Sequence, residues 1–220
     1  MRRLFVFRPE PAAHRTVERA RELGLDATAI PVFKLEPMAW SAPEPSEFDG
    51  LLLTSANAAD MGGKELERLR GLPVHAVGEA TAVAAEVAGF GVASVGRAGV
   101  DELLGSIDPG TRLLHLCGED RRAPEQPNQL IRCVTVYRAR AVERPGSLEE
   151  LRGQVAAVHS PRAAKRLAEL VDEKERATIS VAAISRAAAD AAGTGWANIR
   201  VADSPNDSSL LALARRLCDT

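Results

Sequence analysis

Residues 155–164 read Val-Ala-Ala-Val-His-Ser-Pro-Arg-Ala-Ala, which is a short apolar run, a polar turn with a serine, and an alanine-rich segment. Residues 50–59 read Gly-Leu-Leu-Leu-Thr-Ser-Ala-Asn-Ala-Ala and repeat the same order. A short, continuously apolar run is typical of a strand that is covered on both faces. A serine ahead of an alanine-rich segment is typical of a helix start. Both stretches therefore predict a strand, a turn and a helix.

The same order of segments recurs along most of the chain. Further apolar runs that lead into small or polar residues lie at 4–7, 74–77, 113–116 and 179–184. Strands that alternate with helices are typical of a parallel sheet with helices on both faces. The sequence therefore predicts an α/β protein, and the likeness of the two quoted stretches favours two domains of one design. The alternative, that any two such blocks look alike, stays open.

Two segments, 31–37 and 134–142, break this pattern. Apolar and charged residues alternate in them, which predicts strands with one exposed face. We predict two α/β domains with parallel, Rossmann- or flavodoxin-like sheets, joined by a two-stranded β-ladder that these segments form. The expected ranges are 1–34 plus 144–220 for the first domain, 42–132 for the second, inserted domain, and 35–41 and 133–143 for the linker strands.

Composition excludes several classes of protein. Of the 220 residues, 45% are hydrophobic and 26% are charged, which is unlike a disordered chain. The net charge of −2 argues against a dedicated nucleic-acid-binding protein. No apolar run is long enough for a membrane span, and the run at 4–7 ends at Arg8, too early for a signal peptide.

The cysteines and histidines show no ligand spacing. Cys117, Cys133 and Cys218 are widely separated and form no C-x-x-C pair, and the four histidines are equally scattered. We therefore expect core or surface residues here, with neither a metal site nor a disulfide. Reduced thiols favour a cytoplasmic protein, and nothing in the sequence calls for a cofactor.

Polar turns follow the predicted strands. In a parallel sheet the helices begin at the carboxyl ends of the strands, where their amide groups and dipoles attract carboxylates and phosphates. Each such residue taken alone is better explained as an ordinary helix cap, but together they favour a polyanionic ligand. The candidate binding residues in these turns are Ser55, Asn57, Gly78, Thr81, Ser160 and Ser185.

Three arginines lie at strand-to-helix turns, where each could clamp a carboxylate through two hydrogen bonds. They are Arg8, Arg162 and Arg186, and the alternative for each is an ordinary surface arginine.

Motifs for serine hydrolysis, for a phosphate loop and for dinucleotide binding are missing, which argues against a nucleotide-dependent enzyme. Tyr137 is the only tyrosine and lies in a predicted linker strand. Its phenol could donate a proton, or it could pack at the domain joint.

A set of short motifs in a fixed order carries a family resemblance. They are Arg8-Pro9, Phe48-Asp49-Gly50, Thr54-Ser55-x-Asn57, Val77-Gly78-x-x-Thr81-Ala82, Cys117-Gly118-Glu119, Val136-Tyr137-Arg138, His159-Ser160-Pro161, Ala202-x-x-Pro205 and Leu210-Leu211-Ala212. With these motifs the chain resembles the uroporphyrinogen-III synthase family over nearly its full length.

The resemblance implies two α/β domains joined by a two-stranded ladder, with the active site in the cleft between them and no cofactor. It implies that hydroxymethylbilane, a linear tetrapyrrole with eight carboxylates, loses water and closes to uroporphyrinogen III with ring D inverted through a spiro intermediate. Tyr137 matches the family's linker tyrosine, which assists the leaving hydroxyl. Ser55, Thr81 and Ser160 match turns that bind substrate carboxylates through backbone amides.

The sequence departs from the family pattern at two places. Ser185-Arg186-Ala187-Ala188 replaces a turn that often reads Gly-x-Thr, and residues 119–134 contain no glycine.

We expect a monomer that docks at most transiently with the enzyme that makes its substrate, and neither nucleic acid nor membrane as a partner. The alternative function is a non-catalytic two-domain binder or sensor of a small polyanion.

Overall fold

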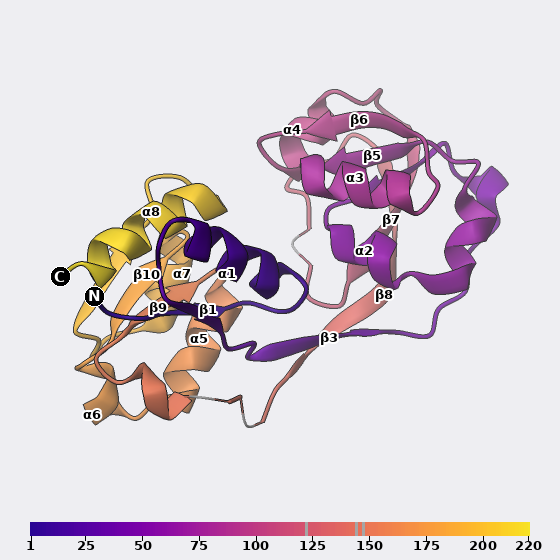
Figure 1. Ribbon diagram of the computed structural model, residues 1–220. Helices are drawn as coiled ribbons and strands as arrows, with labels where there is room; N and C mark the ends of the chain where they lie inside the picture. Colours follow the sequence, from indigo (N-terminus) through magenta and orange to yellow (C-terminus); the bar gives the residue numbers. More distant parts are fainter. Residues whose placement is uncertain (122, 144, 147) are drawn as a thin grey trace. The chain divides into compact units, whose positions relative to one another are not determined.

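The computed structural model describes residues 1–121, 123–143, 145–146 and 148–220. The chain forms two compact units, Met1–Lys34 with Arg140–Thr220, and Leu35–Ala139 (Figure 1). Each unit contains one sheet. The domain boundary that we expected at residue 144 falls on a position outside the described residues.

The first unit is built on a five-stranded sheet in the order β11-β10-β9-β1-β2, and all neighbouring strands run parallel. Its strands are β1 (Leu4–Phe7), β2 (Ala27–Ala29), β9 (Val155–Val158), β10 (Ser180–Ala183) and β11 (Asn198–Val201). The three central strands β10, β9 and β1 are buried throughout, because helices cover both faces of the sheet.

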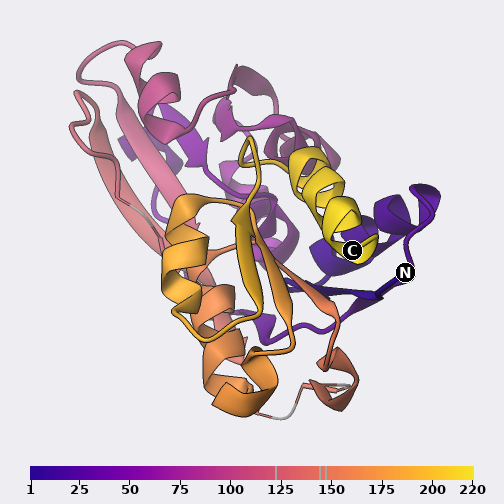
Figure 2. The ribbon, with the colours of Figure 1, turned by 90° about the vertical axis from the view of Figure 1, so that its left-hand side faces the viewer.

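Five α-helices belong to the described part of this unit. They are α1 (Ala12–Glu22), α5 (Pro161–Leu170), α6 (Glu173–Arg176), α7 (Arg186–Ala192) and α8 (Asp207–Cys218), with a 3₁₀ helix at Leu148–Leu151. The buried side of α8 packs with Val17 of α1 against Leu4, Val6 and Val155. Figure 2 shows α8 in yellow on one side of the sheet and the orange helices α5 and α7 on the other. The result is a sheet between two helical layers.

The second unit has a six-stranded sheet in the order β3-β8-β7-β4-β5-β6. The strands are β3 (Phe33–Pro37), β4 (Gly50–Leu53), β5 (Val74–Val77), β6 (Val92–Gly96), β7 (Arg112–Gly118) and β8 (Leu130–Ala141). The helices are α2 (Ala56–Met61), α3 (Glu79–Val87) and α4 (Val100–Gly105), with 3₁₀ helices at Pro45–Glu47 and Gly63–Leu69. The pairs β8-β7, β7-β4, β4-β5 and β5-β6 are parallel. The predicted α/β class with parallel sheets is therefore confirmed.

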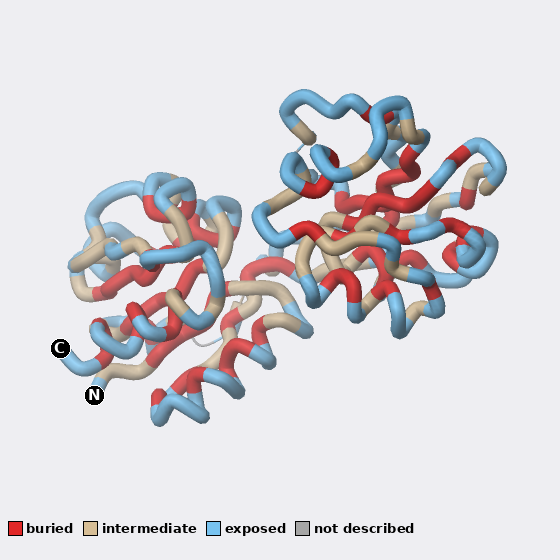
Figure 3. Tube along the Cα trace, turned by 90° about the horizontal axis from the view of Figure 1, so that it is seen from above, coloured by how far each residue is buried: buried red, intermediate tan, exposed pale blue. Residues whose placement is uncertain are grey.

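The two faces of this sheet carry separate apolar clusters, because successive side chains of a strand point to opposite faces. One cluster contains Leu51, Leu114 and Val136 together with residues of α2 and α3. The other contains Leu52 and Leu113 with the buried leucines of α4. Figure 3 shows buried residues, in red, in the interior of each unit and exposed residues, in pale blue, on its outside.

The charged-alternating segments of the sequence form β3 and β8. The amide of Met38 donates to the carbonyl of Val136 at 2.9 Å, and the amide of Val142 donates to the carbonyl of Val32 at 3.0 Å. From the first bond to the second, the residue number falls from 38 to 32 on one segment and rises from 136 to 142 on the other. Strands β3 and β8 therefore run antiparallel. The first half of β8, from Leu130, is also paired in parallel with β7. Strand β8 is therefore longer than the predicted strand at 134–142.

None of the helices in the described part of the chain combines the length and the apolar character that a membrane span requires.

Candidate functional site

Five of the predicted site residues follow strands of the first sheet. Phe7, Val158 and Ala183 stand at one level, since β9 pairs in register with both β1 and β10. Arg8 directly follows β1, Ser160 and Arg162 follow β9, and Ser185 and Arg186 follow β10. The structure therefore places all five along the carboxyl edge of this sheet.

Serine hydroxyls begin two helices at this edge. The Oγ atom of Ser160 accepts a hydrogen bond from the amide of Ala163 at 3.1 Å, and α5 begins there. The Oγ atom of Ser185 accepts one from the amide of Ala188 at 3.3 Å, and α7 begins there. A cap satisfies one amide of the first helical turn and leaves others oriented toward a ligand or solvent. The partial positive charge of the helix end adds to the attraction for an anion.

The three arginines of this edge differ in their surroundings. The guanidinium of Arg162 lies 4.3 Å from the ring centroid of Phe33, which is buried. Arg186 is exposed at the first position of α7. Arg8 is half-buried and donates to the hydroxyl of Thr16 at 3.1 Å, and burial lowers the pKa of its guanidinium. Arg162 and Arg186 are therefore the more accessible cations of the edge.

A half-buried carboxylate, that of Asp207 at the start of α8, lies beside Arg8. Its Oδ1 atom accepts hydrogen bonds from Nε2 of His159 at 2.9 Å and from the Thr16 hydroxyl at 3.0 Å. Its Oδ2 atom accepts from Arg19 at 2.9 Å, and Nη1 of Arg8 lies 3.5 Å from Oδ1. Sequence reasoning missed this network, because its members are far apart in the chain; a carboxylate beside a helix start was the one local signal.

Two opposing effects set the pKa of Asp207. Burial by itself raises the pKa of the carboxyl, but hydrogen bonds from His159, Arg19 and Thr16 outweigh it and hold the pKa at about 2. Burial also lowers the pKa of His159, and its hydrogen bond to Asp207 only partly opposes this. The pair at neutral pH is therefore an ionised carboxylate that accepts a hydrogen bond from an uncharged imidazole.

The remaining turn residues lie at the carboxyl edge of the second sheet. The Oγ atom of Ser55 accepts from the amide of Asn57 at 3.3 Å, where α2 begins. Gly78 precedes α3 with a φ of 84°, a backbone conformation that side chains other than glycine rarely adopt. Thr81 lies within the first turn of α3 and is buried, and its amide donates to the carbonyl of Gly78 at 3.0 Å. Residues 55, 57 and 78 are thus partly accessible at this edge, whereas the Thr81 side chain belongs to the packed interior.

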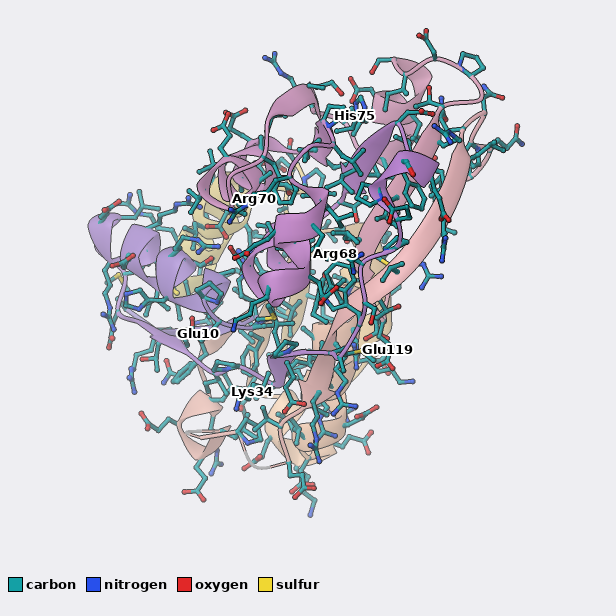
Figure 4. All side chains as sticks on the ribbon, turned by 90° about the vertical axis from the view of Figure 1, so that its right-hand side faces the viewer. Glu10, Lys34, Arg68, Arg70, His75 and Glu119 are labelled. Atoms are coloured by element: carbon teal, nitrogen blue, oxygen red, sulfur yellow. The ribbon has the colours of Figure 1, made fainter. Side chains whose placement is uncertain are left out.

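Tyr137 lies on β8 beside the end of β7. The register between these strands shifts at Cys117 and Gly118, so that Gly118 stands opposite Tyr137. This bulge breaks the alternation of side chains, and Tyr137 packs against the same apolar cluster as Val136. The amide of Glu119 donates to the carbonyl of Tyr137 at 2.9 Å (Glu119 is labelled in Figure 4).

Gly118 is what allows the tyrosine ring to lie there. A Cβ atom at position 118 would stand 2.7 Å from Cζ and 3.0 Å from the hydroxyl oxygen of Tyr137. The ring therefore rests directly on the glycine backbone, half-buried, with its hydroxyl close to the end of β7.

The structure brings one histidine and two cysteines together, although their spacing along the chain did not indicate a ligand group. His115, Cys117 and Cys133 place their ligand atoms within 4.8 Å of one another. Strands β7 and β8 are neighbours, and His115 pairs with Cys133 in the register. Burial lowers the pKa of His115 to about 4, and the charge of Arg121 acts in the same direction, so the imidazole is uncharged at neutral pH. Spacing along the chain could not show this group, because it forms across two strands.

Comparisons with known proteins give consistent results. A family model described as "Uroporphyrinogen-III synthase HemD" matches residues 14–212. The fold resembles the crystal structure of uroporphyrinogen-III synthetase from Helicobacter pylori 26695, with a TM-score of 0.68 at 17% identity, over 99% of this chain and 100% of that chain. It also resembles a mutant uroporphyrinogen III synthase from the extremely thermophilic bacterium Thermus thermophilus, with a TM-score of 0.52 at 18% identity, over 99% and 100%. A search of curated protein sequences found no significant match.

Proposed function

Because the chain belongs to the uroporphyrinogen-III synthase family, whose members are cyclising hydro-lyases of tetrapyrrole biosynthesis, we propose that it converts hydroxymethylbilane into uroporphyrinogen III. The reaction closes the linear tetrapyrrole with inversion of ring D and loss of one water, and we propose that no cofactor takes part. The observation that carries this proposal is the family match over residues 14–212 of the 220-residue chain.

The helix starts of both units support a substrate rich in carboxylates. Helices α5 and α3 begin at Ser160 and Gly78, at the carboxyl edges of the first and second sheets. Amide groups and the helix dipole at such ends bind carboxylates, and an arginine adds a charge-assisted hydrogen bond. We assign substrate carboxylates to the turns at Ser55, Asn57, Gly78, Thr81, Ser160 and Ser185, and to Arg8, Arg162 and Arg186.

Tyr137 is the proposed proton donor. Its phenol would give a proton to the hydroxyl of ring A as the carbon–oxygen bond breaks, and the group would leave as water. The cation that remains would be attacked by the substituted carbon of ring D, and the spiro product would reopen and close with loss of a proton. Most of the rate enhancement would come from holding the two ends of the bilane together.

Tyr137→Phe is therefore expected to lower turnover about 100-fold, because the proton donor is lost while the ring remains. The phenyl ring still packs on Gly118, so the unfolding curve and the circular dichroism spectrum are expected to match the unsubstituted protein. Turnover is measured from uroporphyrinogen III formed at saturating hydroxymethylbilane. A full rate in a correctly folded variant would remove the proton-donor role.

Charge reversal at the carboxyl edge of the first sheet is expected to weaken substrate binding. Arg162→Glu and Arg186→Glu should each raise KM about tenfold, because each replaces an attraction for a carboxylate by a repulsion. Arg70→Glu is the matched control, since Arg70 is exposed and precedes β5, at the opposite end of that strand from its strand-to-helix turn (Arg70 is labelled in Figure 4). KM is measured by initial rates at fixed ionic strength. An equal change in all three variants would show that the edge holds no carboxylate.

Product analysis tests the function itself. The purified chain is incubated with hydroxymethylbilane, and isomers I and III are separated after oxidation to porphyrins. Isomer III is expected to dominate, because the uncatalysed reaction gives isomer I. Isomer I alone at the rate of the buffer control would reject the enzyme, and bilane binding without isomer III would identify the polyanion-binding protein instead.

We also propose that β3 and β8 serve as the connector between the two units, since both strands cross the unit boundaries at 34/35 and 139/140. We further propose that the chain acts as a cytoplasmic monomer and docks at most transiently with the enzyme that produces its unstable substrate. Light scattering coupled to size-exclusion chromatography is expected to give one chain per particle, near 23.4 kDa.

A further inference from the structure

One histidine and two cysteines lie together in the second unit. They are on the face of the sheet opposite to the apolar cluster that Tyr137 packs against. His115 and Cys117 are two positions apart on β7, so their side chains share a face, and both residues are buried. Cys133 on β8 pairs with His115 in the register and is exposed. The ligand atoms of all three lie within 4.8 Å of one another.

We propose that His115, Cys117 and Cys133 bind one Zn²⁺ ion, with solvent as the fourth ligand. The proposal concerns a site that is separate from the proposed reaction and does not depend on it. Two thiolates and one imidazole are a ligand set that zinc accepts, and three protein ligands with a solvent position are common for this metal. The exposed side of Cys133 supplies the solvent position.

The distances suit this ion. Zinc–sulfur and zinc–nitrogen bonds of about 2.3 and 2.0 Å at a tetrahedral angle separate the two ligand atoms by about 3.5 Å. The Nδ1 atom of His115 lies 3.7 Å from the Sγ atom of Cys133. Cys117 needs only a small side-chain adjustment, because its sulfur belongs to the same group within 4.8 Å.

A hydrogen bond orients the imidazole for this role. The Nε2 atom of His115 lies 3.1 Å from the hydroxyl of Thr54, which follows β4. In the tautomer with its proton on Nε2, the ring donates to Thr54 and turns the lone pair of Nδ1 toward Cys133. Metal-binding histidines commonly hold their second nitrogen in this way, and the partner sets the tautomer.

The cysteines are placed less well for a disulfide. Cys117 pairs with Thr135 in the register, so Cys133 is its diagonal neighbour on β8. Adjacent strands lie about 4.8 Å apart and two residues span about 6.6 Å along a parallel strand, so the Cα atoms of diagonal neighbours are about 8 Å apart. Disulfides usually join Cα atoms about 4.4–6.8 Å apart. A metal ion between the two sulfurs avoids this mismatch. Binding releases the two thiol protons, so affinity should rise with pH.

Cobalt(II) titration of the reduced, metal-free protein tests the site. One equivalent of Co²⁺ is expected to give the intense visible bands of a tetrahedral site and a thiolate-to-cobalt charge-transfer band, and Zn²⁺ should remove both. Cys133→Ser is expected to weaken binding at least tenfold and to keep the fold, since position 133 is exposed. Thr54→Val is expected to weaken Zn²⁺ binding about 10- to 100-fold without loss of a ligand.

Cys218→Ser is the matched control, because Cys218 is a free cysteine buried in the first unit, in the apolar cluster of α8. It should bind Co²⁺ with unchanged bands and affinity. The proposal is overturned by the absence of tetrahedral bands in the reduced protein, or by bands that persist in Cys133→Ser. It is also overturned if the purified chain carries a Cys117–Cys133 disulfide and takes up no metal after reduction.

Discussion

Asp207→Asn is expected to lower the free energy of unfolding by about 3 kcal/mol, because a paired, mostly buried charge is removed from a network of four partners. The Asp207 side chain is 14% exposed and that of His159 is 6% exposed. The carboxylate connects the start of α8 to Arg8 after β1, to Thr16 of α1 and to His159 after β9. An amide keeps the shape but accepts fewer hydrogen bonds and leaves Arg8 without its counter-ion.

The same network predicts an acid-dependent loss of stability. The folded-state pKa of Asp207 is about 2, below the ordinary value of 3.8. A lowered carboxyl pKa contributes stability that is complete above about pH 4 and is lost as the pH falls through 2. This difference corresponds to about 2 kcal/mol. The unsubstituted protein should therefore lose about that much more stability than Asp207→Asn between pH 4 and pH 2.

Urea unfolding at several pH values measures both effects. Asp203→Asn is the matched control, because the Asp203 side chain is 85% exposed and its ion pair with Arg216 is long, at 3.9 Å. An exposed pair of this kind contributes less than about 1 kcal/mol, so its loss should leave the curve nearly unchanged. If Asp207→Asn behaved like this control, the network would not stabilise the first unit.

Gly118→Ala is expected to destabilise the protein by about 1–3 kcal/mol and to lower turnover at least as far as Tyr137→Phe does. A methyl group at position 118 would stand 2.7 Å from Cζ and 2.8 Å from Cε2 of Tyr137, well inside contact distance. Overpacking against a rigid ring forces the ring or the strand to move, at a cost of about this size. Displacement of the ring also moves the proposed proton donor, so Gly118 acts as a positioning residue.

Two comparisons isolate this steric effect. Gly71→Ala is the control, since nothing lies within 4 Å of a Cβ atom there, and it should change neither stability nor turnover appreciably. In a Tyr137→Ala background, Gly118→Ala should cost less than about 0.5 kcal/mol, because the clashing ring is gone. An equal cost in both backgrounds would place the strain in the backbone of β7 and not in the tyrosine.

The strands and helix starts of both units were readable from local pattern. The run Leu51-Leu52-Leu53 with Ser55, and the run at 155–158 with Ser160, form a strand and a capped helix as predicted. Such features depend on neighbours a few residues away, so sequence order suffices to identify them. The roles of the turn residues and of Tyr137 in binding and catalysis remain predictions.

Three features required the tertiary structure. The network at Asp207 joins residues that are far apart in the chain, such as Arg8 and Asp207, and the group His115, Cys117 and Cys133 forms across β7 and β8. The contact of Tyr137 with Gly118 depends on a register shift between the same strands. Local pattern thus determines which segments become strands and helices and where their turns offer amides. Which side chains then meet depends on strand order and register, and these follow from packing over the whole unit, which no short stretch of sequence contains.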